Sequence, residues 1–441
     1  MTDITALPVE ERLLDLLQEL RIAQVNIVAR DAADWQSFVG TYPDRVASLS
    51  LLCPIALDPR GLVKSAQRAL VITGDRGTAA EGVIKAVEAI DGVRSFTLRD
   101  YEALMWSDLA ADRAGDIGPA LLDFLRRIDR DRPISRAHLL EGEGEIAGVS
   151  YRIQGSGPPL VLMPLLLSPS QWEPLLPALS EHYCTIVLGG AFLGSVAMLE
   201  ARGRGVYLGM IRTLLDIARI RPGEAVLDVG CGTGVVIREI ARRAAGANRL
   251  FGLDMSPYLL REARALAARE GYANAIEFRD GRAEALPFAD ASIDVTLAST
   301  VLEEGNAARM LAELIRVTKP GGRIGVVVRA VDIPGWVNLP LPAATRAKVE
   351  APGLFGGGVV AGGCADASLY ARFRAAGLTE LSAFPQLTAL APDDPRLPMF
   401  QQQALAALSG SEIPEWRRAV TEAAGTSFIA MPHHCAVGTK P

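Results

Sequence analysis

The chain has 441 residues, more than one average domain holds, so two or three domains are expected. Hydrophobic residues make up 49% and charged residues 22%, a balance that excludes a disordered or fibrous chain. The 45 Lys and Arg residues against 51 Asp and Glu residues give a net charge of −6, which argues against nucleic acid as a dedicated partner.

Cysteine usage and the N-terminus bear on the expected compartment. The five cysteines lie far apart and form no metal-binding spacing with the four histidines, so we expect reduced thiols, a cytoplasmic location and no metal. The N-terminus carries acidic residues in place of a basic, apolar leader, and Pro164 breaks the longest apolar run. The sequence therefore predicts neither export nor membrane insertion.

The N-terminal part of the chain alternates helical and strand patterns. Apolar residues recur at helical spacing over residues 11–22. Three buried strands are expected at residues 25–28, 46–52 and 69–72. Alternating elements of this kind indicate an α/β domain.

Two polar stretches separate this first piece from a second. The charged run at 126–133 and the alternating Glu and Gly residues at 141–145 both favour solvated connections. We therefore divide the region into residues 1–132 and residues 133–202. The second piece again has an α/β pattern, with strands expected at 149–153, 160–163 and 184–188 and a helix at 172–179.

The most regular patterning belongs to a third segment, residues 203–441. A helix is expected at 206–220, a strand at 225–229 and a helix at 235–245. A Gly- and Pro-rich tract at 334–363 is interpreted either as a lid over a substrate or as a plain surface insertion.

A glycine-rich motif joins the strand at 225–229 to the helix that follows. Its pattern is D-x-G-x-G-x-G, formed by Asp228, Gly230, Gly232 and Gly234. Glycines let the backbone turn sharply and approach a ligand, and the following helix presents free N–H groups. This arrangement is typical of nucleotide binding at the switch point of an α/β sheet.

The motif differs from the dinucleotide fingerprint G-x-G-x-x-G. The third glycine of that pattern would fall at Val235 or Ile237, so the pattern fails. An acidic residue two positions before the first glycine suits a ligand with an ammonium group better than one with a pyrophosphate. Asp228 therefore indicates a nucleoside that carries an amino acid.

These residues resemble the class I S-adenosylmethionine-dependent methyltransferases over roughly residues 205–441. The resemblance implies a Rossmann-like, doubly wound, mostly parallel sheet with an antiparallel last strand, and S-adenosylmethionine as the cofactor. The glycine loop would wrap the methionyl part of the cofactor. Asp254 at the end of the second strand would bind both ribose hydroxyls, and Met255 would lie against the adenine.

The third family signature departs from its usual form. Arg282 and Ala283 stand at the start of R-A-E-A-L-P-F, where relatives usually have D-A-E-x-L-P-F and the aspartate binds the adenine amino group. An arginine cannot accept that hydrogen bond. The contact is therefore lost, taken over by Asp280, or replaced by stacking of the guanidinium on the purine.

Two further positions complete the expected cofactor site. Ser299 ends the stretch that resembles the fourth strand, beside the reacting methyl group. Tyr207 lies on the helix before the first motif, where relatives place an aromatic lid over the cofactor, and core packing is the equal alternative. Trp336 is a weaker candidate for the acceptor pocket. Of His433 and His434, in the expected last strand, at most one faces the site, and a structural role is favoured.

Glu303 and Glu304 follow the fourth strand, where small-molecule relatives often carry histidines. A carboxylate there could act as a general base toward a hydroxyl or a protonated amine. The alternative is that both residues cap or solvate the start of the next helix. Methyl transfer depends mainly on holding the acceptor in line with the methyl group in a dry pocket, so a base is not obligatory.

The region 1–202 resembles α/β-hydrolases in two pieces of exchanged order. The expected nucleophile elbow G-x-S-x-G is replaced by A-R-D-A-A, with Asp31 at the nucleophile position. The first 137 residues contain no histidine, and His138 and His182 fall outside the expected loop, so no triad is recognised. We expect a catalytically silent region that shapes the acceptor pocket, mediates homodimerisation or docks a partner.

The leading hypothesis is therefore a methyltransferase that moves a methyl group from S-adenosylmethionine to a small-molecule acceptor. One alternative is a cofactor-binding pseudo-enzyme or regulatory protein, which would bind the cofactor without turnover. Another keeps the cofactor pocket but performs demethylation or dehalogenation. Neither a nucleic acid nor a membrane is an expected partner.

Overall fold

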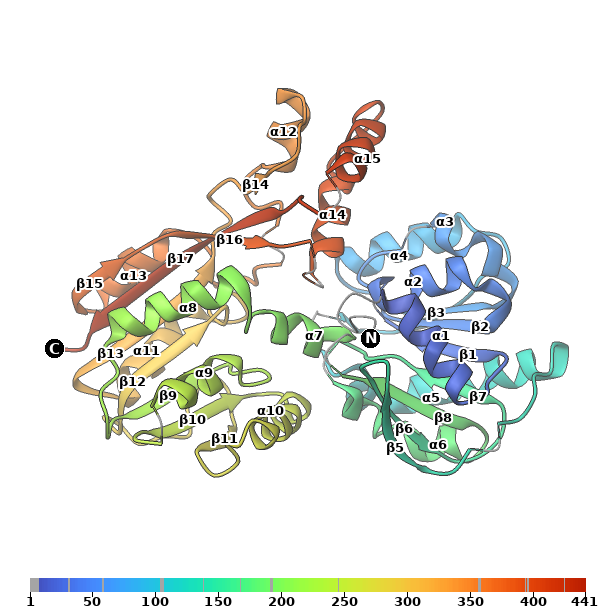
Figure 1. The fold of residues 1–441 in the computed structure, drawn as a ribbon, viewed down its shortest axis with the longest axis horizontal. Coiled ribbons are helices and arrows are strands. Elements are labelled where there is room, and N and C mark those ends of the chain that lie inside the picture. Colours follow the sequence, from blue (N-terminus) through green and yellow to red (C-terminus); the bar gives the residue numbers. More distant parts are fainter. Residues whose placement is uncertain are drawn as a thin grey trace. The chain divides into compact units, whose positions relative to one another are not determined.

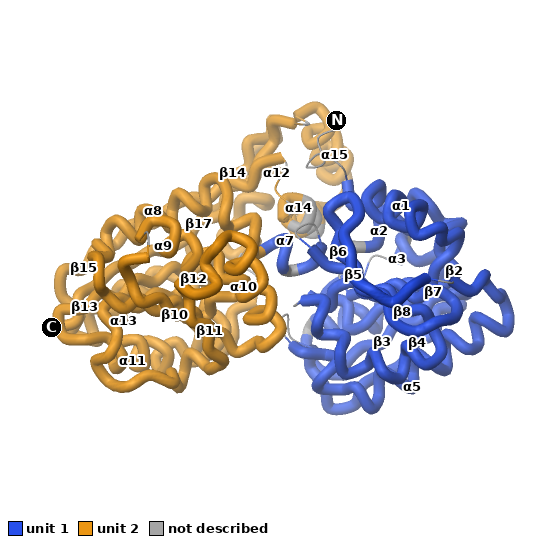
Figure 2. Tube along the Cα trace, turned by 60° about the horizontal axis from the view of Figure 1, so that its bottom comes forward, with its two compact units in different colours: residues 1–198 blue, residues 199–441 orange. Residues whose placement is uncertain are grey.

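The computed structural model describes residues 8–441 except 31, 58, 104–106, 138, 167, 191–192, 245, 356–357, 393, 395 and 424. The chain forms two compact units, Met1–Met198 and Leu199–Pro441, which are coloured separately in Figure 2. Each unit is built on its own mixed β-sheet with helices on both faces. None of the helices in the described part of the chain is both long and apolar enough to span a membrane.

The sheet of the first unit has the strand order β4-β3-β2-β1-β7-β8-β6-β5. Five neighbouring pairs in this sheet are parallel, whereas β6 runs antiparallel to both β8 and β5. The strands are β1 (Val25–Ala29), β2 (Val46–Leu52), β3 (Ala69–Gly74), β4 (Arg94–Leu98), β5 (Gly142–Ile146), β6 (Val149–Gln154), β7 (Pro159–Leu162) and β8 (Cys184–Gly189). The two pieces expected from the sequence thus share one sheet.

Helices cover both faces of this sheet because successive strand side chains point in opposite directions. Val25 and Ile27 of β1 belong to the core beneath α1, α2 and α4, and Val28 belongs to the opposite core beneath α5 and α6. The helices are α1 (Val9–Glu19), α2 (Ala32–Thr41), α3 (Pro59–Leu62), α4 (Thr78–Glu88), α5 (Leu109–Asp131) and α6 (Leu176–Ser180), and α7 (Gly194–Ala201) crosses the boundary between the two units. Three short 3-10 helices are η2 (Pro43–Arg45), η3 (Val63–Arg68) and η4 (Pro169–Trp172).

The structure corrects the two connections that were expected at the end of the first piece. Most of the charged run 126–133 lies inside α5, whose apolar stripe includes the buried Leu125 and Ile128 while Arg126 and Arg130 are exposed. Residues 142–146 form the edge strand β5, paired antiparallel with β6. Charge marks an exposed helix face or an exposed sheet edge as readily as a loop, and this misled the interpretation.

The sheet of the second unit follows the path β11-β10-β9-β12-β13-β17-β14, with β15 and β16 also paired to β17. The strands from β11 to β13 are parallel, and β17 is antiparallel to β13, so the expected antiparallel last strand is confirmed. The strands are β9 (Ala225–Val229), β10 (Arg249–Asp254), β11 (Ile276–Asp280), β12 (Ile293–Ser299), β13 (Thr318–Arg329), β14 (Trp336–Val337), β15 (Thr379–Ala383), β16 (Gln386–Leu390) and β17 (Ile429–Thr439).

Helices again cover both faces of this second sheet (Figure 1). Side chains of α8 and α9 form one core, and those of α11 and α13 form the core on the opposite face. The helices are α8 (Gly205–Ala218), α9 (Val235–Ala244), α10 (Pro257–Arg269), α11 (Ala307–Val317), α12 (Ala343–Val349), α13 (Ser368–Ala375), α14 (Leu397–Ala406) and α15 (Glu412–Glu422).

The Gly- and Pro-rich tract 334–363 is more ordered than a plain loop. It contains β14 and α12, and their apolar side chains share a separate core with α14 and α15. This helical subdomain projects from the end of the sheet where β16 and β17 meet (Figure 1). The tract is therefore part of a structured insertion.

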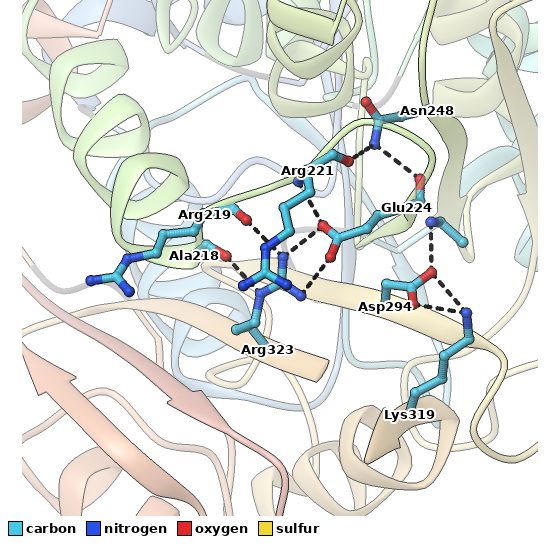
Figure 3. A network of polar contacts seen from close by, with 9 residues as sticks. Ala218, Arg219, Arg221, Glu224, Asn248, Asp294, Lys319 and Arg323 are labelled. Carbon is cyan, nitrogen blue, oxygen red and sulfur yellow. Dashed lines mark hydrogen bonds and ion pairs between the residues drawn. The ribbon is translucent and has the colours of Figure 1, made fainter. Parts of the chain in front are cut away.

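A polar network fixes the amino ends of the central strands (Figure 3). Arg323 of β13 binds both carboxylate oxygens of Glu224, at 2.9 and 2.6 Å, and donates to the carbonyls of Ala218 and Arg219. Asp294 of β12 accepts from the backbone N–H of Ala225 and pairs with Lys319. These contacts tie α8, β9, β12 and β13 together at the end of the sheet opposite the glycine loop.

Candidate functional site

The candidate site lies at the carboxyl ends of β9, β10, β11 and β12. The order of the sheet reverses at β9, which pairs with β10 on one side and with β12 on the other. Ligands of open α/β sheets bind at such a switch point, outside the carboxyl ends of the strands. The glycine loop and the residues predicted from the motifs follow these strand ends.

The three glycines of the loop adopt backbone conformations that other residues rarely tolerate. Their φ angles are +68° at Gly230, +55° at Gly232 and +83° at Gly234. At Gly230 a Cβ atom would also lie 2.3 Å from a side-chain carbon of Val301. Glycine is thus required both by the turn and by the close approach of the loop to the segment that follows β12.

Asp228 points a carboxylate oxygen into a buried environment. Its side chain is 2% exposed, and Oδ2 has no hydrogen-bond partner in the described part of the chain. Burial raises the pKa of Asp228 to about 8, and the nearby Asp254 acts in the same direction. A buried carboxylate oxygen without a partner is costly, so the position fits a site that a cationic ligand group completes.

Asp254 ends β10 next to the glycine loop. Its Oδ2 accepts from the backbone N–H of Gly232 at 2.9 Å, and its Oδ1 accepts from Ser256 at 2.9 Å. Burial raises the pKa of Asp254, and these two N–H donors oppose the rise. Met255, the next residue, is 57% exposed, so its side chain is open to contact with a ligand.

Arg282 lies on the turn that follows β11. It forms an isolated β-bridge with Ala285, and its guanidinium lies 3.6 Å from the carboxylate of Glu284. The Arg282 side chain is 64% exposed, whereas Ala283 packs against the core beneath α11. Asp280, the alternative adenine partner, is also exposed.

Tyr207 and Ser299 meet across the site. The Tyr207 hydroxyl lies 2.9 Å from Ser299 Oγ, at the end of β12. The Tyr207 ring is 3% exposed and contacts the ring of His433 edge to face, with centroids 5.6 Å apart. The Tyr207 ring is thus packed in the core, while its hydroxyl reaches the end of β12.

His433 and His434 point to opposite sides of β17, as expected for neighbours in a strand. His433 lies on the Tyr207 side, and burial lowers its pKa to about 3. His434 is bound between Asp332 and Tyr370, at 2.8 and 2.9 Å. One histidine therefore lies beside Tyr207, and the other is held by polar partners on the opposite face of β17.

Glu303 and Glu304 both contact Arg329 at the end of β13. Glu303 is fully buried, and its Oε1 accepts from the backbone N–H of Arg329 at 2.7 Å. Its Oε2 has no partner in the part of the chain that the structure describes. Burial raises the pKa of Glu303 to about 7, against the opposing effect of Arg329. Asn306, and neither glutamate, caps α11 by accepting from Arg309 N–H.

Several residues at the site were not recognised in the sequence. Glu200 accepts from the Thr233 hydroxyl of the glycine loop at 2.6 Å and pairs with Arg238 of α9. Arg202 donates to the Thr300 hydroxyl just after β12, at 2.9 Å. These contacts join segments that are distant in sequence, and no local motif marks them. The Asp31 and His138 positions lie outside the described residues.

Comparisons with known proteins match the part of the chain that contains this site. Residues 226–322 match a family model described as a methyltransferase domain. A sterol 24-C-methyltransferase from Gibberella zeae is 33% identical over 33% of this chain and 35% of its own length. A demethylmenaquinone methyltransferase from Symbiobacterium thermophilum is 31% identical over 34% of this chain and 61% of its own length.

The likeness covers only part of this chain and part of each of these curated relatives. The matched stretch spans 34% to 61% of the length of the first curated relatives. The solved structure of the YcgJ protein from Bacillus subtilis aligns with 53% of this chain and 98% of its own, at 18% identity and a TM-score of 0.38. By the family model, residues 226–322 form a class I methyltransferase domain, and the cofactor of that class is S-adenosylmethionine.

Proposed function

We propose that this protein transfers a methyl group from S-adenosylmethionine to a small-molecule acceptor. The observation that carries the proposal is the unpartnered carboxylate oxygen of Asp228, buried beside three glycines with positive φ at the switch point. The cofactor presents an ammonium group, which this oxygen would bind in a charge-assisted hydrogen bond.

The remaining site residues have distinct proposed roles. Asp254 receives the ribose hydroxyls, Met255 and Arg282 contact the adenine, and Tyr207 and Ser299 close the site near the reacting methyl group. The bound cofactor supplies an activated methyl group on a sulfonium. The protein then has to hold the acceptor in line with that group and exclude water.

Glu303 is the proposed general base. Its free Oε2 and a pKa near 7 suit a group that takes a proton from an acceptor at neutral pH. Glu304 shares Arg329 with it and is proposed to position that arginine. The relatives support a small acceptor, since their names include a demethylmenaquinone methyltransferase and a nocamycin O-methyltransferase.

The first unit is proposed to be an α/β-hydrolase-like region without catalysis. In the order of its sheet, β5, β6, β8 and β7 precede β1 to β4, so exchanging the two pieces would give the strand order typical of that fold. Arg30, at the end of β1, is buried and donates to the carbonyls of Cys53 and Leu165. Its guanidinium thus lies among the segments that follow β1, β2 and β7, where a hydrolase would bind its substrate.

Calorimetric titration with S-adenosylmethionine and S-adenosylhomocysteine tests the proposed cofactor site. Wild-type protein is expected to bind both, and Asp254→Ala to weaken both by about 10- to 100-fold, because hydrogen bonds to a charged group are lost. Asp290→Ala is the matched control, since Asp290 is exposed and pairs with Arg316 away from the site. Failure of the wild type to bind either ligand would overturn the proposed function.

A further inference from the structure

The candidate site has an acidic side and a basic side. Asp228 and Asp254 lie at the glycine loop, where the cofactor is proposed to bind. Around Tyr207 and His433, by contrast, three arginines approach from different segments: Arg202, Arg329 and Arg396. Burial lowers the pKa of His433, and the positive charge of each of these guanidiniums lowers it further.

Tyr207 is the centre of the basic side. The Arg202 guanidinium carbon lies 5.4 Å from the centroid of the Tyr207 ring, and that of Arg396 lies 5.9 Å from it. The same tyrosine reaches Ser299 at the end of β12 through its hydroxyl. Positive charge is therefore held next to the strand end where methyl transfer is proposed to take place.

Two of the three arginines are neutralised by carboxylates. Arg396 binds both oxygens of Asp394, at 2.9 and 2.6 Å. Arg329 pairs with Glu303 and Glu304, at 3.5 and 3.0 Å. Both guanidiniums thus already have carboxylate partners.

Arg202 differs from both. Within the described ranges the only hydrogen bond of its guanidinium goes to the neutral hydroxyl of Thr300, and the guanidinium has no carboxylate partner there. The side chain is partly exposed, and a guanidinium has five N–H donors, so most of its capacity is unused.

His433 cannot compensate the Arg202 charge. Burial and the neighbouring arginines lower the pKa of His433 to about 3, so its ring is neutral. Its Nδ1 lies 3.2 Å from the carbonyl oxygen of Met431 and 3.3 Å from Thr388 Oγ1. The basic side thus retains one uncompensated positive charge.

We propose that Arg202 recognises the methyl acceptor by binding an acidic group on it, a carboxylate in the first instance. This rests on the proposed methyltransferase function and adds the class of acceptor to it. A planar guanidinium matches a carboxylate in two parallel hydrogen bonds. The same charge would favour acceptors that approach as anions and oppose acceptors that approach as cations.

The test uses the full chain saturated with S-adenosylhomocysteine and pairs of probes that differ only in charge. The probes are benzoic, salicylic and anthranilic acids, each beside its primary amide, titrated by calorimetry. We expect at least one acid to bind about 10-fold or more tightly than its amide. Arg202→Gln should remove that preference, and Arg202→Lys should restore part of it.

Arg204→Gln is the matched control because Arg204 lies two residues away and is exposed. Equal binding of acids and amides, or the absence of binding by every acid, would overturn the proposal. So would an Arg202→Gln variant that loses S-adenosylhomocysteine and keeps its acid preference, since Arg202 would then serve the cofactor. Failure of the wild type to bind S-adenosylhomocysteine at all is a separate result that overturns the methyltransferase function itself.

Discussion

Asp228 shows how one buried side chain can couple cofactor binding to protonation. With a pKa of about 8, its carboxyl is mostly protonated at pH 7 in the free protein. Binding of an ammonium group favours the ionised form and therefore lowers that pKa. The proton held by Asp228 must then leave as the cofactor binds.

We therefore predict that S-adenosylhomocysteine binding at pH 7 releases up to about one proton per chain. Calorimetry in two buffers of different ionisation enthalpy measures this release. Asp228→Asn, which cannot ionise, should bind more weakly and release fewer protons, whereas Asp290→Asn should behave as the wild type. Equal proton release by Asp228→Asn and wild type would show that the proton comes from elsewhere.

Glu303 leads to a prediction about the pH dependence of turnover. Its raised pKa, about 7, means that the base form is absent at pH 5 and complete near pH 9. Methylation of a hydroxyl acceptor should therefore increase with pH through about 7. Glu303→Gln should lower kcat by about 100-fold or more and remove this dependence, with cofactor affinity unchanged.

The control for Glu303 is Glu277→Gln, because Glu277 is exposed and pairs with Arg279 on β11. Rates are measured with an acceptor found by screening, at saturating cofactor. A Glu303→Gln enzyme that keeps the wild-type rate and profile would leave Glu303 a structural partner of Arg329.

At the scale of single elements, the turn between β9 and α9 is defined by glycines. Gly230→Ala adds a Cβ 2.3 Å from Val301 at a φ of +68°. We predict a loss of about 2 kcal/mol of unfolding free energy and at least 10-fold weaker cofactor binding. Gly223→Ala, with φ +87° and no atom within 4 Å, isolates backbone strain and should leave cofactor affinity unchanged.

The polar network in Figure 3 leads to a prediction of lower stability with cofactor binding retained. Arg323→Met removes two hydrogen bonds to Glu224 and two to backbone carbonyls at the amino ends of the strands. We expect about 2 to 3 kcal/mol lower unfolding free energy in urea, because the mostly buried Glu224 carboxylate loses its cationic partner. Cofactor affinity should stay within a factor of two, since the site lies at the opposite strand ends.

Local patterns predicted those elements whose structure depends on nearby residues. Strand β9 and helix α9 follow from an apolar run and a glycine turn, and both were expected within a residue of their observed bounds. The run at 126–133 was misinterpreted because charge on an exposed helix face resembles charge in a loop. Composition alone does not distinguish the two.

The site was predictable to the extent that its residues follow strand ends within one motif. Asp228 and Asp254 meet these conditions and lie together in the structure, whereas their roles toward the cofactor stay predictions. Glu200 and Arg202 do not, because their contacts with Thr233 and Thr300 cross 33 and 98 residues of sequence. Long-range polar contacts carry no periodic signal that a single sequence reveals.

At the scale of the whole molecule, each unit has its own sheet and its own cores. The second unit buries apolar side chains on both faces of its sheet without needing the strands of the first. A fragment of residues 194–441, which retains α7 whole, is therefore expected to fold and to bind S-adenosylhomocysteine within about threefold of the full chain.

A shorter fragment tests whether the segment before α8 contributes to cofactor binding by the second unit. Residues 205–441 keep every strand of the second sheet but lose Glu200 and Arg202, and with them the contacts to Thr233, Arg238 and Thr300. Arg238 would retain Glu270 as its ion-pair partner, so folding should survive. We expect cooperative unfolding in both fragments but about 10-fold weaker cofactor binding by the shorter one, because the glycine loop loses its hydrogen bond to Glu200. Equal affinity in the two fragments would show that the loop holds its shape without that segment.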